Sequence, residues 1–155
     1  MRSDLLEEQR LSAIRLTAIC QIQHTHLVDE PPKIKGIVWV GSSKRDLKAF
    51  PAEVRDVMGY ALYQAQVGRK SPSAKPLAGY GGASVLEIVE DFQTNTYRAV
   101  YTVKFSEQVY VLHAFQKKSK KGIATPKPDL DLIKKRLALA EQDYKTRSTH
   151  RGRDK

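Results

Sequence analysis

Three side chains that could act on a phosphodiester occur in successive strand-like segments: Glu87, Arg98 and His113. Cleavage of RNA by its own 2′-hydroxyl needs a proton acceptor, a cation to stabilise the charge that develops at phosphorus, and an acid for the leaving oxygen. A carboxylate, a guanidinium and an imidazole can supply these functions without a metal ion. From spacing alone, however, the favoured interpretation is structural: a Glu–Arg pair across two strands beside a solvated histidine.

These residues would be positioned by three strands, predicted at 84–91, 97–105 and 108–115 from their Val, Ile, Tyr and Phe content. The short connections predict antiparallel hairpins, and side chains alternate between the two faces of a sheet. The face that carries the chemistry is expected to be open and to present Glu87, Val89, Arg98, Val100, Thr102, Lys104, Val111, His113 and Phe115. The face under the helices is expected to present Leu86, Ile88, Ala99, Tyr101, Val103, Tyr110, Leu112 and Ala114.

The remaining elements complete an α+β domain. A first strand is expected at 36–40, followed by a short helix with a capping-box-like start at Ser43. A longer helix begins at Pro51 and ends near Gly68, and its apolar residues recur at spacings of three and four. Residues 68–83 are predicted to be a loop from their Gly, Pro and Ser content. A final helix places Leu130, Ile133, Leu137, Ala140 and Tyr144 on one side. The predicted order is therefore β-α-α-β-β-β-α, with a mainly antiparallel sheet packed on helices.

The positive charge lies mostly in the last quarter of the chain. The 155 residues carry a formal charge of +10, and residues 117–155 contain 13 Lys or Arg against 5 Asp or Glu. Such a field attracts nucleic acid. The alternative is a solvated basic tail that only aids solubility.

Several classes of protein and site are excluded or disfavoured. A single cysteine, Cys20, leaves no intramolecular disulfide and no multi-cysteine zinc site, and His24 and His26 lack companion ligands nearby in the sequence. No apolar run is long enough to cross a membrane, and acidic residues stand near the N-terminus where a secretory signal would be basic. No phosphate-binding loop or convincing helix-turn-helix is present, so a lone DNA-binding regulator is disfavoured. We therefore expect a cytoplasmic protein without cofactor or metal.

Three segments are expected along the chain. Residues 1–33 form an N-terminal extension, partly helical or disordered, which two prolines end. Residues 35–146 form the domain, and residues 147–155 form a disordered basic tail.

A set of short motifs resembles the phage-derived HigB-like branch of the RelE toxin superfamily over about residues 36–145. The motifs are Ile37-Val38-Trp39-Val40-Gly41-Ser42-Ser43-Lys44-Arg45-Asp46-Leu47, Lys75-Pro76-Leu77-Ala78-Gly79, Val85-Leu86-Glu87-Ile88, Tyr97-Arg98-Ala99-Val100-Tyr101 and Val111-Leu112-His113-Ala114-Phe115-Gln116-Lys117-Lys118-Ser119. The specificity lies in their combination.

The resemblance implies a RelE-like fold and the toxin of a toxin–antitoxin pair. Such toxins enter the ribosomal decoding site and cut the bound messenger as metal-independent endoribonucleases. The implied partners are the ribosome, the messenger and a helix-turn-helix antitoxin of the HigA type, with operator DNA contacted only through the toxin–antitoxin complex.

The resemblance also implies roles for individual residues. Arg98 matches the strand arginine that contacts the scissile phosphate. Lys117 and Lys118 fall where the family has basic residues that hold phosphate or serve catalysis, and Lys75 lies in a loop expected to touch the RNA backbone. The RNA-binding candidates are Lys75, Lys104, Lys120 and Lys121.

The general base stays open at this point. Relatives can carry a lysine on the second strand of the predicted order, and here Glu87 and Val89 stand at those positions. Glu87 is a candidate base or a structural partner of Arg98, and His113 is a candidate acid or base. Because the lysine of the relatives is absent here, an alternative function stays open. In this alternative the fold is a catalytically inactive module that binds RNA, the ribosome or a partner protein.

Overall fold

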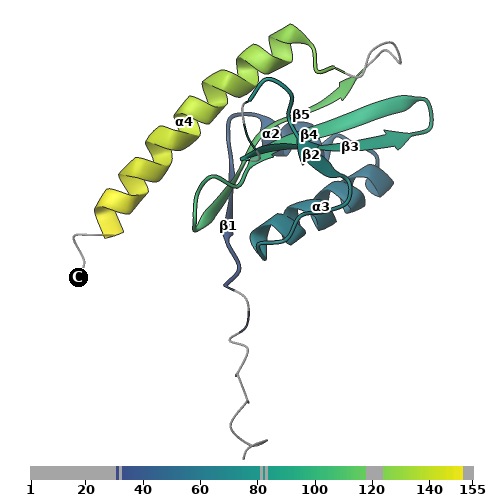
Figure 1. Ribbon diagram of the computed structural model, residues 1–155. Helices are drawn as coiled ribbons and strands as arrows, with labels where there is room; N and C mark the ends of the chain where they lie inside the picture. The colour runs from purple at the N-terminus through teal and green to yellow at the C-terminus, as the bar shows by residue number, and fades with distance from the viewer. Residues whose placement is uncertain (1–30, 32, 81, 83, 118–123, 152–155) are drawn as a thin grey trace, which may run out of the picture. The chain divides into compact units, whose positions relative to one another are not determined.

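The computed structural model describes residue 31 and residues 33–80, 82, 84–117 and 124–151 (Figure 1). The chain divides into two units, Met1–Pro32 and Lys33–Lys155, and every element described here belongs to the second unit. In chain order the elements are β1 (Gly36–Trp39), α2 (Ser43–Lys48), α3 (Ala52–Gln66), β2 (Ala74–Pro76), β3 (Val85–Phe92), β4 (Asn95–Thr102), β5 (Gln108–Lys117) and α4 (Lys127–Arg151).

The strands form one five-stranded sheet in the order β1-β5-β4-β3-β2. The strands β2 to β5 pair antiparallel with their neighbours, and β1 pairs parallel with β5. The β3–β4 turn is tight because Gln93 adopts a φ of 56°, a backbone conformation common in two-residue hairpin turns. The predicted α+β class with a mainly antiparallel sheet is confirmed.

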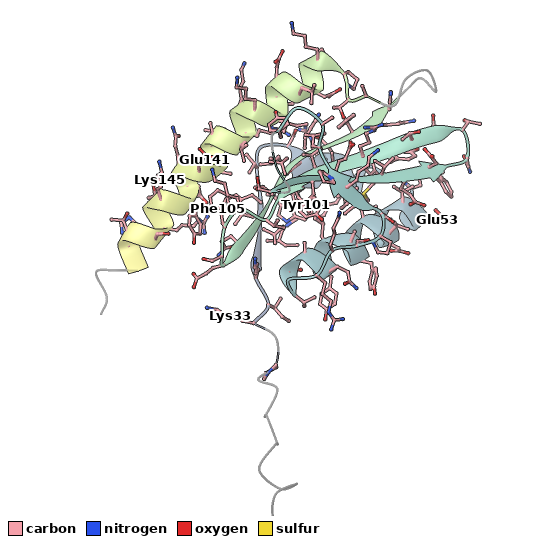
Figure 2. The ribbon with its side chains drawn as sticks, viewed as in Figure 1. Lys33, Glu53, Tyr101, Phe105, Glu141 and Lys145 are labelled. Carbon is pink, nitrogen blue, oxygen red and sulfur yellow. The ribbon has the colours of Figure 1, made fainter. Side chains whose placement is uncertain are left out.

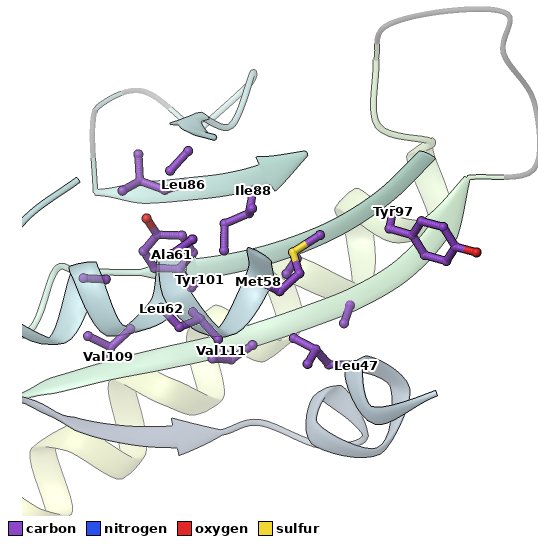
Figure 3. Close-up of a cluster of buried hydrophobic side chains, with 14 of the residues drawn as sticks. Leu47, Met58, Ala61, Leu62, Leu86, Ile88, Tyr97, Tyr101, Val109 and Val111 are labelled. Carbon is purple, nitrogen blue, oxygen red and sulfur yellow. The ribbon is translucent and has the colours of Figure 1, made fainter. Parts of the chain in front are cut away.

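One face of the sheet packs on α2 and α3. Apolar residues at helical spacing on α3, including Met58 and Leu62, meet alternate residues of β3, β4 and β5 such as Ile88, Tyr101 and Val111 (Figure 3). All five are almost completely buried. This side of the domain is an apolar core, as the spacing of the α3 residues predicts.

The other face is not open, contrary to the prediction, because α4 packs along it. Ile133 and Ala140 are buried with Val100, Tyr110 and other residues of that face. Helix α4 contacts the sheet chiefly through β5. The apolar side predicted for this helix therefore covers the sheet face that carries the candidate chemistry.

The predicted faces in β5 are wrong for Tyr110, Val111 and Leu112 and correct from His113 onward, because the strand contains a bulge. The pairing passes from Val100–His113 to Tyr101–Val111, which leaves Leu112 as an extra residue. Leu112 and His113 consequently both lie on the α4 side, while Val111 and Ala114 belong to the α2–α3 core.

Other boundaries also differ from prediction. The expected loop contains the short edge strand β2, where Pro76 is tolerated because only one edge is paired. Helix α2 begins at Ser43, so its N-cap residue is Ser42 and not the predicted Ser43. The Ser43 hydroxyl donates instead to the Val111 carbonyl of β5 (3.0 Å). Helix α4 continues to Arg151, past the start predicted for the basic tail. Apart from residues 31 and 33, the predicted extension lies outside the described residues.

Candidate functional site

A buried ion pair joins Glu87 of β3 and Arg98 of β4. The Arg98 Nη1 donates to Glu87 Oε2 at 2.7 Å, and the two side chains are only 4% and 6% exposed. The sheet register sets this geometry, because Glu87 stands opposite Val100 and Arg98 opposite Val89, so the two side chains meet diagonally on one face. The structural Glu–Arg pair across two strands, which the spacing in the sequence favours, is therefore observed between Glu87 and Arg98.

Thr125 closes the pair from the segment that precedes α4. Arg98 Nη1 also donates to Thr125 Oγ1 at 3.1 Å, and that hydroxyl lies 3.4 Å from Glu87 Oε2. The pair is therefore held between the sheet and the segment that leads into the last helix.

Lys75 joins the same cluster from the edge strand. Residues Lys75 and Glu87 are directly opposed in the β2–β3 ladder, and Lys75 Nζ lies 3.6 Å from Glu87 Oε1. Beside them is a pocket of about 320 Å³, lined by Lys75, Pro76, Ala78, Glu87, Ala124, Thr125 and Leu130. A carboxylate oxygen and a half-exposed ammonium group thus border one cavity, whose other walls are mainly apolar.

His113 lies on the same sheet face but contacts α4 through both of its ring nitrogens. Its Nε2 is 2.9 Å from Asp129 Oδ1, and its Nδ1 is 3.2 Å from Arg136 Nη1. Because a guanidinium can only donate, Nδ1 is assigned as acceptor and Nε2–H as donor to Asp129. The ring also stacks on Phe115 with centroids 4.8 Å apart. His113 therefore anchors the first half of α4 and is separated from the Lys75 pocket.

Arg136 is a central residue that the sequence analysis did not single out. Its side chain reaches from α4 to the Leu112 carbonyl (2.8 Å) and to Ser42 Oγ (2.8 Å), in addition to His113. It lies against Gly41, where an added Cβ would come within 3.0 Å of the guanidinium. The sequence signal that could have identified Arg136 as buried is its spacing. It lies three residues after Ile133 and four before Ala140, on the buried side of α4.

Of the remaining candidates, Lys104 is remote from the cluster. Its ammonium pairs at 2.6 Å with Glu141. Glu141 lies in the second half of α4 (Figure 2). Glu141 is separated from Asp129 by about 18 Å of helix. Lys117 donates to the Ala124 carbonyl at 3.1 Å, close to Thr125. Lys118, Lys120 and Lys121 lie outside the described residues.

The arrangement is suited to binding a phosphodiester and moving a proton. Lys75 and Arg98 are cations that could offset charge developing on phosphorus, and Glu87 is a carboxylate within reach of both. Within the described ranges no three His, Cys, Asp or Glu side chains are grouped as a metal site. In the same ranges, no helix has the length and apolar character needed to span a membrane.

Comparison with known proteins identifies one family. The model of the family described as phage-derived protein Gp49-like (DUF891) matches residues 45–138, which include Lys75, Glu87, Arg98 and His113. This family is one of the RelE/ParE-like toxin families of toxin–antitoxin systems. A search of curated proteins gives no significant match.

Proposed function

Because the chain belongs to the phage-derived Gp49-like family, we propose that it is a HigB-like toxin that cleaves messenger RNA on the ribosome without a metal ion. The observation that carries the proposal is the cluster of Lys75, Glu87 and Arg98 at one pocket, within the region that the family model matches. The proposed partners are a HigA-like helix-turn-helix antitoxin, the ribosome and its messenger, with operator DNA bound only through the antitoxin. The proposed location is the cytoplasm, where ribosomes are found.

In the proposed reaction the 2′-hydroxyl gives its proton to the base and attacks the adjacent phosphorus, and the P–O5′ bond breaks. The products are a 2′,3′-cyclic phosphate and a 5′-hydroxyl, whose oxygen takes a proton from solvent. Arg98 and Lys75 stabilise the additional negative charge on the phosphoryl oxygens in the transition state. Glu87 holds both cations and is the better placed of the two candidate bases, because both ring nitrogens of His113 are engaged by α4. Lys117 and Lys118, at the end of β5 and just beyond it, are proposed to bind the flanking phosphates, together with Lys120 and Lys121.

The burial of Arg98 places a condition on this mechanism. The guanidinium lies behind Glu87 and Thr125 and is almost inaccessible to solvent. For Arg98 to contact a phosphate, the segment that carries Thr125 must move away from the sheet. The proposal therefore predicts that RNA binding changes the environment of Thr125.

Two variants on induced expression test the proposal. Lys75→Ala removes an exposed cation without disturbing the core, and we expect about tenfold slower messenger cleavage. Arg98→Lys keeps the charge beside Glu87 but loses the planar donor fork, and we expect about a hundredfold loss. The measurement is growth arrest together with mapping of messenger ends on purified ribosomes.

The matched control is Lys134→Ala, which removes an exposed cation from α4. It should arrest growth and cleave as the wild type does. A wild-type chain that neither arrests growth nor cleaves messenger on ribosomes would contradict the proposal, as would full activity in the Arg98→Lys variant.

The same burial favours one alternative function. A catalytically inactive module would retain the Glu87–Arg98 pair for stability alone and bind RNA, the ribosome or a partner protein. This alternative predicts ribosome binding without cleavage, and equal binding by the wild type and Arg98→Lys.

A further inference from the structure

A second surface, on the other side of the sheet, has the features of a protein-binding site. Among the described residues, four large hydrophobic side chains are exposed, and three of them are Ile34, Tyr60 and Tyr63, at 58%, 60% and 48%. The fourth, Leu139, is on α4. Exposed apolar side chains that gather on one surface commonly mark an interaction site.

These three side chains belong to neighbouring segments. Tyr60 and Tyr63 are three residues apart on α3, so they are adjacent on its surface. Lys35 N donates to the Gln66 carbonyl at 3.0 Å, and Gln66 Nε2 donates to the Lys35 carbonyl at 2.7 Å. These two bonds hold the residues just before β1 against the last turn of α3, and so bring the backbone of Ile34 close to the end of that helix.

A basic pocket adjoins this surface at the end of α3. Its volume is about 290 Å³, and it is lined by Lys35, Ala65, Gly68, Arg69, Lys70, Leu86 and Val103. The walls are thus aliphatic, and the charged residues are all cations. Gly68 turns the chain at a φ of 76°, which a residue with a side chain rarely adopts, and so directs Arg69 and Lys70 to the pocket.

Two of the cations that line this pocket, Arg69 and Lys70, are not paired with an acidic side chain in the described ranges. Within the part of the chain that the structure describes, the side chains of Arg69 and Lys70 make no hydrogen bond or ion pair. The sequence from residue 57 to residue 86 contains no Asp or Glu. The positive charge here is therefore not balanced locally, and a partner of opposite charge would gain from it.

We propose that this surface, made of Ile34, Tyr60, Tyr63 and the basic pocket, binds an acidic amphipathic segment of another protein. Aliphatic side chains of the segment would enter the pocket between Ala65, Leu86 and Val103, while its carboxylates pair with Arg69 and Lys70. An aliphatic pocket fits Leu or Ile better than a nucleobase, which favours a protein over RNA as the occupant.

The proposed surface is separate from the candidate catalytic cluster. Leu86 of the pocket points to the α3 side of the sheet, whereas the adjacent Glu87 points to the α4 side. A segment bound at the α3 side would leave the pocket beside Lys75 uncovered. The inference therefore goes beyond the proposed cleavage and does not depend on it.

Selection of a phage-displayed library of random short peptides on the full chain tests the inference. We expect a consensus that combines Asp or Glu with Leu or Ile. Peptides from that consensus should bind the Arg69→Glu/Lys70→Glu variant about tenfold more weakly or worse, as measured by fluorescence anisotropy.

The matched control is Lys134→Glu/Lys135→Glu, which makes the same change in net charge at exposed positions of α4. Equal weakening by both double variants would show that only overall charge matters and would overturn the inference. Selection of peptides without an acidic and aliphatic consensus would do the same, as would competition of the bound peptide by single-stranded RNA but not by acidic peptides. If the wild type cleaves messenger, the Arg69→Glu/Lys70→Glu variant should cleave it equally.

Discussion

The two faces of the sheet are both buried, but they are buried in different ways. On the α2–α3 side the side chains of the core are almost entirely apolar. Tyr101 belongs to this core and carries one polar atom, the oxygen of its hydroxyl. On the α4 side an apolar cluster is accompanied by buried polar groups, among them Glu87, Arg98, His113 and Arg136.

Burial of a charged group destabilises the folded state unless the group is paired. Charged groups are therefore expected on a buried sheet face only where each has a partner. Here each has a partner: Glu87 with Arg98, and His113 with Asp129 and Arg136. The comparison shows that the α2–α3 side is stabilised by apolar packing, whereas the α4 side also buries the charged groups on which the proposed chemistry depends. The same contrast predicts different responses to substitution on the two sides.

The largest expected effect is on the α4 side. Arg98→Ala leaves the Glu87 carboxylate buried beside Thr125 without its main partner, and we expect a loss of about 3–5 kcal/mol in the free energy of unfolding. Urea denaturation followed by circular dichroism measures it. The control is Glu87→Gln/Arg98→Gln, which removes both charges and should be less destabilising than Arg98→Ala. If the double variant is the less stable of the two, the charges themselves stabilise the fold and the contrast between the faces is wrong.

An intermediate effect is expected at the second half of α4. Asp143 Oδ2 accepts from Arg147 Nε at 2.6 Å and from Tyr110 Oη at 2.8 Å. The bond from Arg147, helped by the one from Tyr110, holds the pKa of Asp143 below its usual value. A carboxyl group with a lowered folded-state pKa contributes stability above its unfolded pKa, and this is lost as pH falls through the folded value.

The Asp143→Asn variant should therefore be less stable than the wild type at neutral pH, and the difference should shrink on acidification. Urea denaturation across an acidic pH series checks this. Asp56→Asn, on the exposed side of α3, is the control and should show no such trend. A wild-type advantage that stays constant as the pH falls would contradict the assignment.

The smallest expected effect is on the α2–α3 side. The Tyr101 hydroxyl is buried without a hydrogen-bond partner among the described residues, and burial raises the pKa of this phenol to about 12 (Figure 3). Tyr101→Phe removes the unpaired group, so we expect stability to rise by up to about 1 kcal/mol. Thermal unfolding measures it, and a clear loss of stability would mean that the hydroxyl has a partner and that this face is less apolar than described.

Much of the fold follows from apolar spacing in the sequence. The pattern of α3 and of β3 and β4 predicts these elements and the side each one buries, because many residues contribute to each pattern. Glu87, Arg98 and His113 also fall on one face, as alternation predicts. That helices cover both faces could not be predicted, because the apolar side of α4 fits either layer.

The features that the sequence missed depend on single residues. The bulge at Leu112 has no local signature, because the residues on either side of it are apolar whichever face they occupy. Arg136 is buried on the same side of α4 as Ile133 and Ala140, but a charged residue is normally predicted to be exposed. Strand β2 is predicted to be a loop because it contains Pro76 and is flanked by Gly- and Ser-rich residues. Each of these depends on pairing with a distant part of the chain.

The extra residue in β5 makes this strand behave as two half-strands that are out of phase with each other. Up to Leu112 the even-numbered positions face α4, and from His113 onward the odd-numbered ones do. Deletion of Leu112 would give one continuous phase and one register with β4, in which His113 still stands opposite Val100. It would remove the Leu112 side chain from the α4 cluster and the Leu112 carbonyl that accepts from Arg136 Nη1. The bulge therefore lets two consecutive residues of one strand, Leu112 and His113, both contact α4, the first through its carbonyl and the second through its ring.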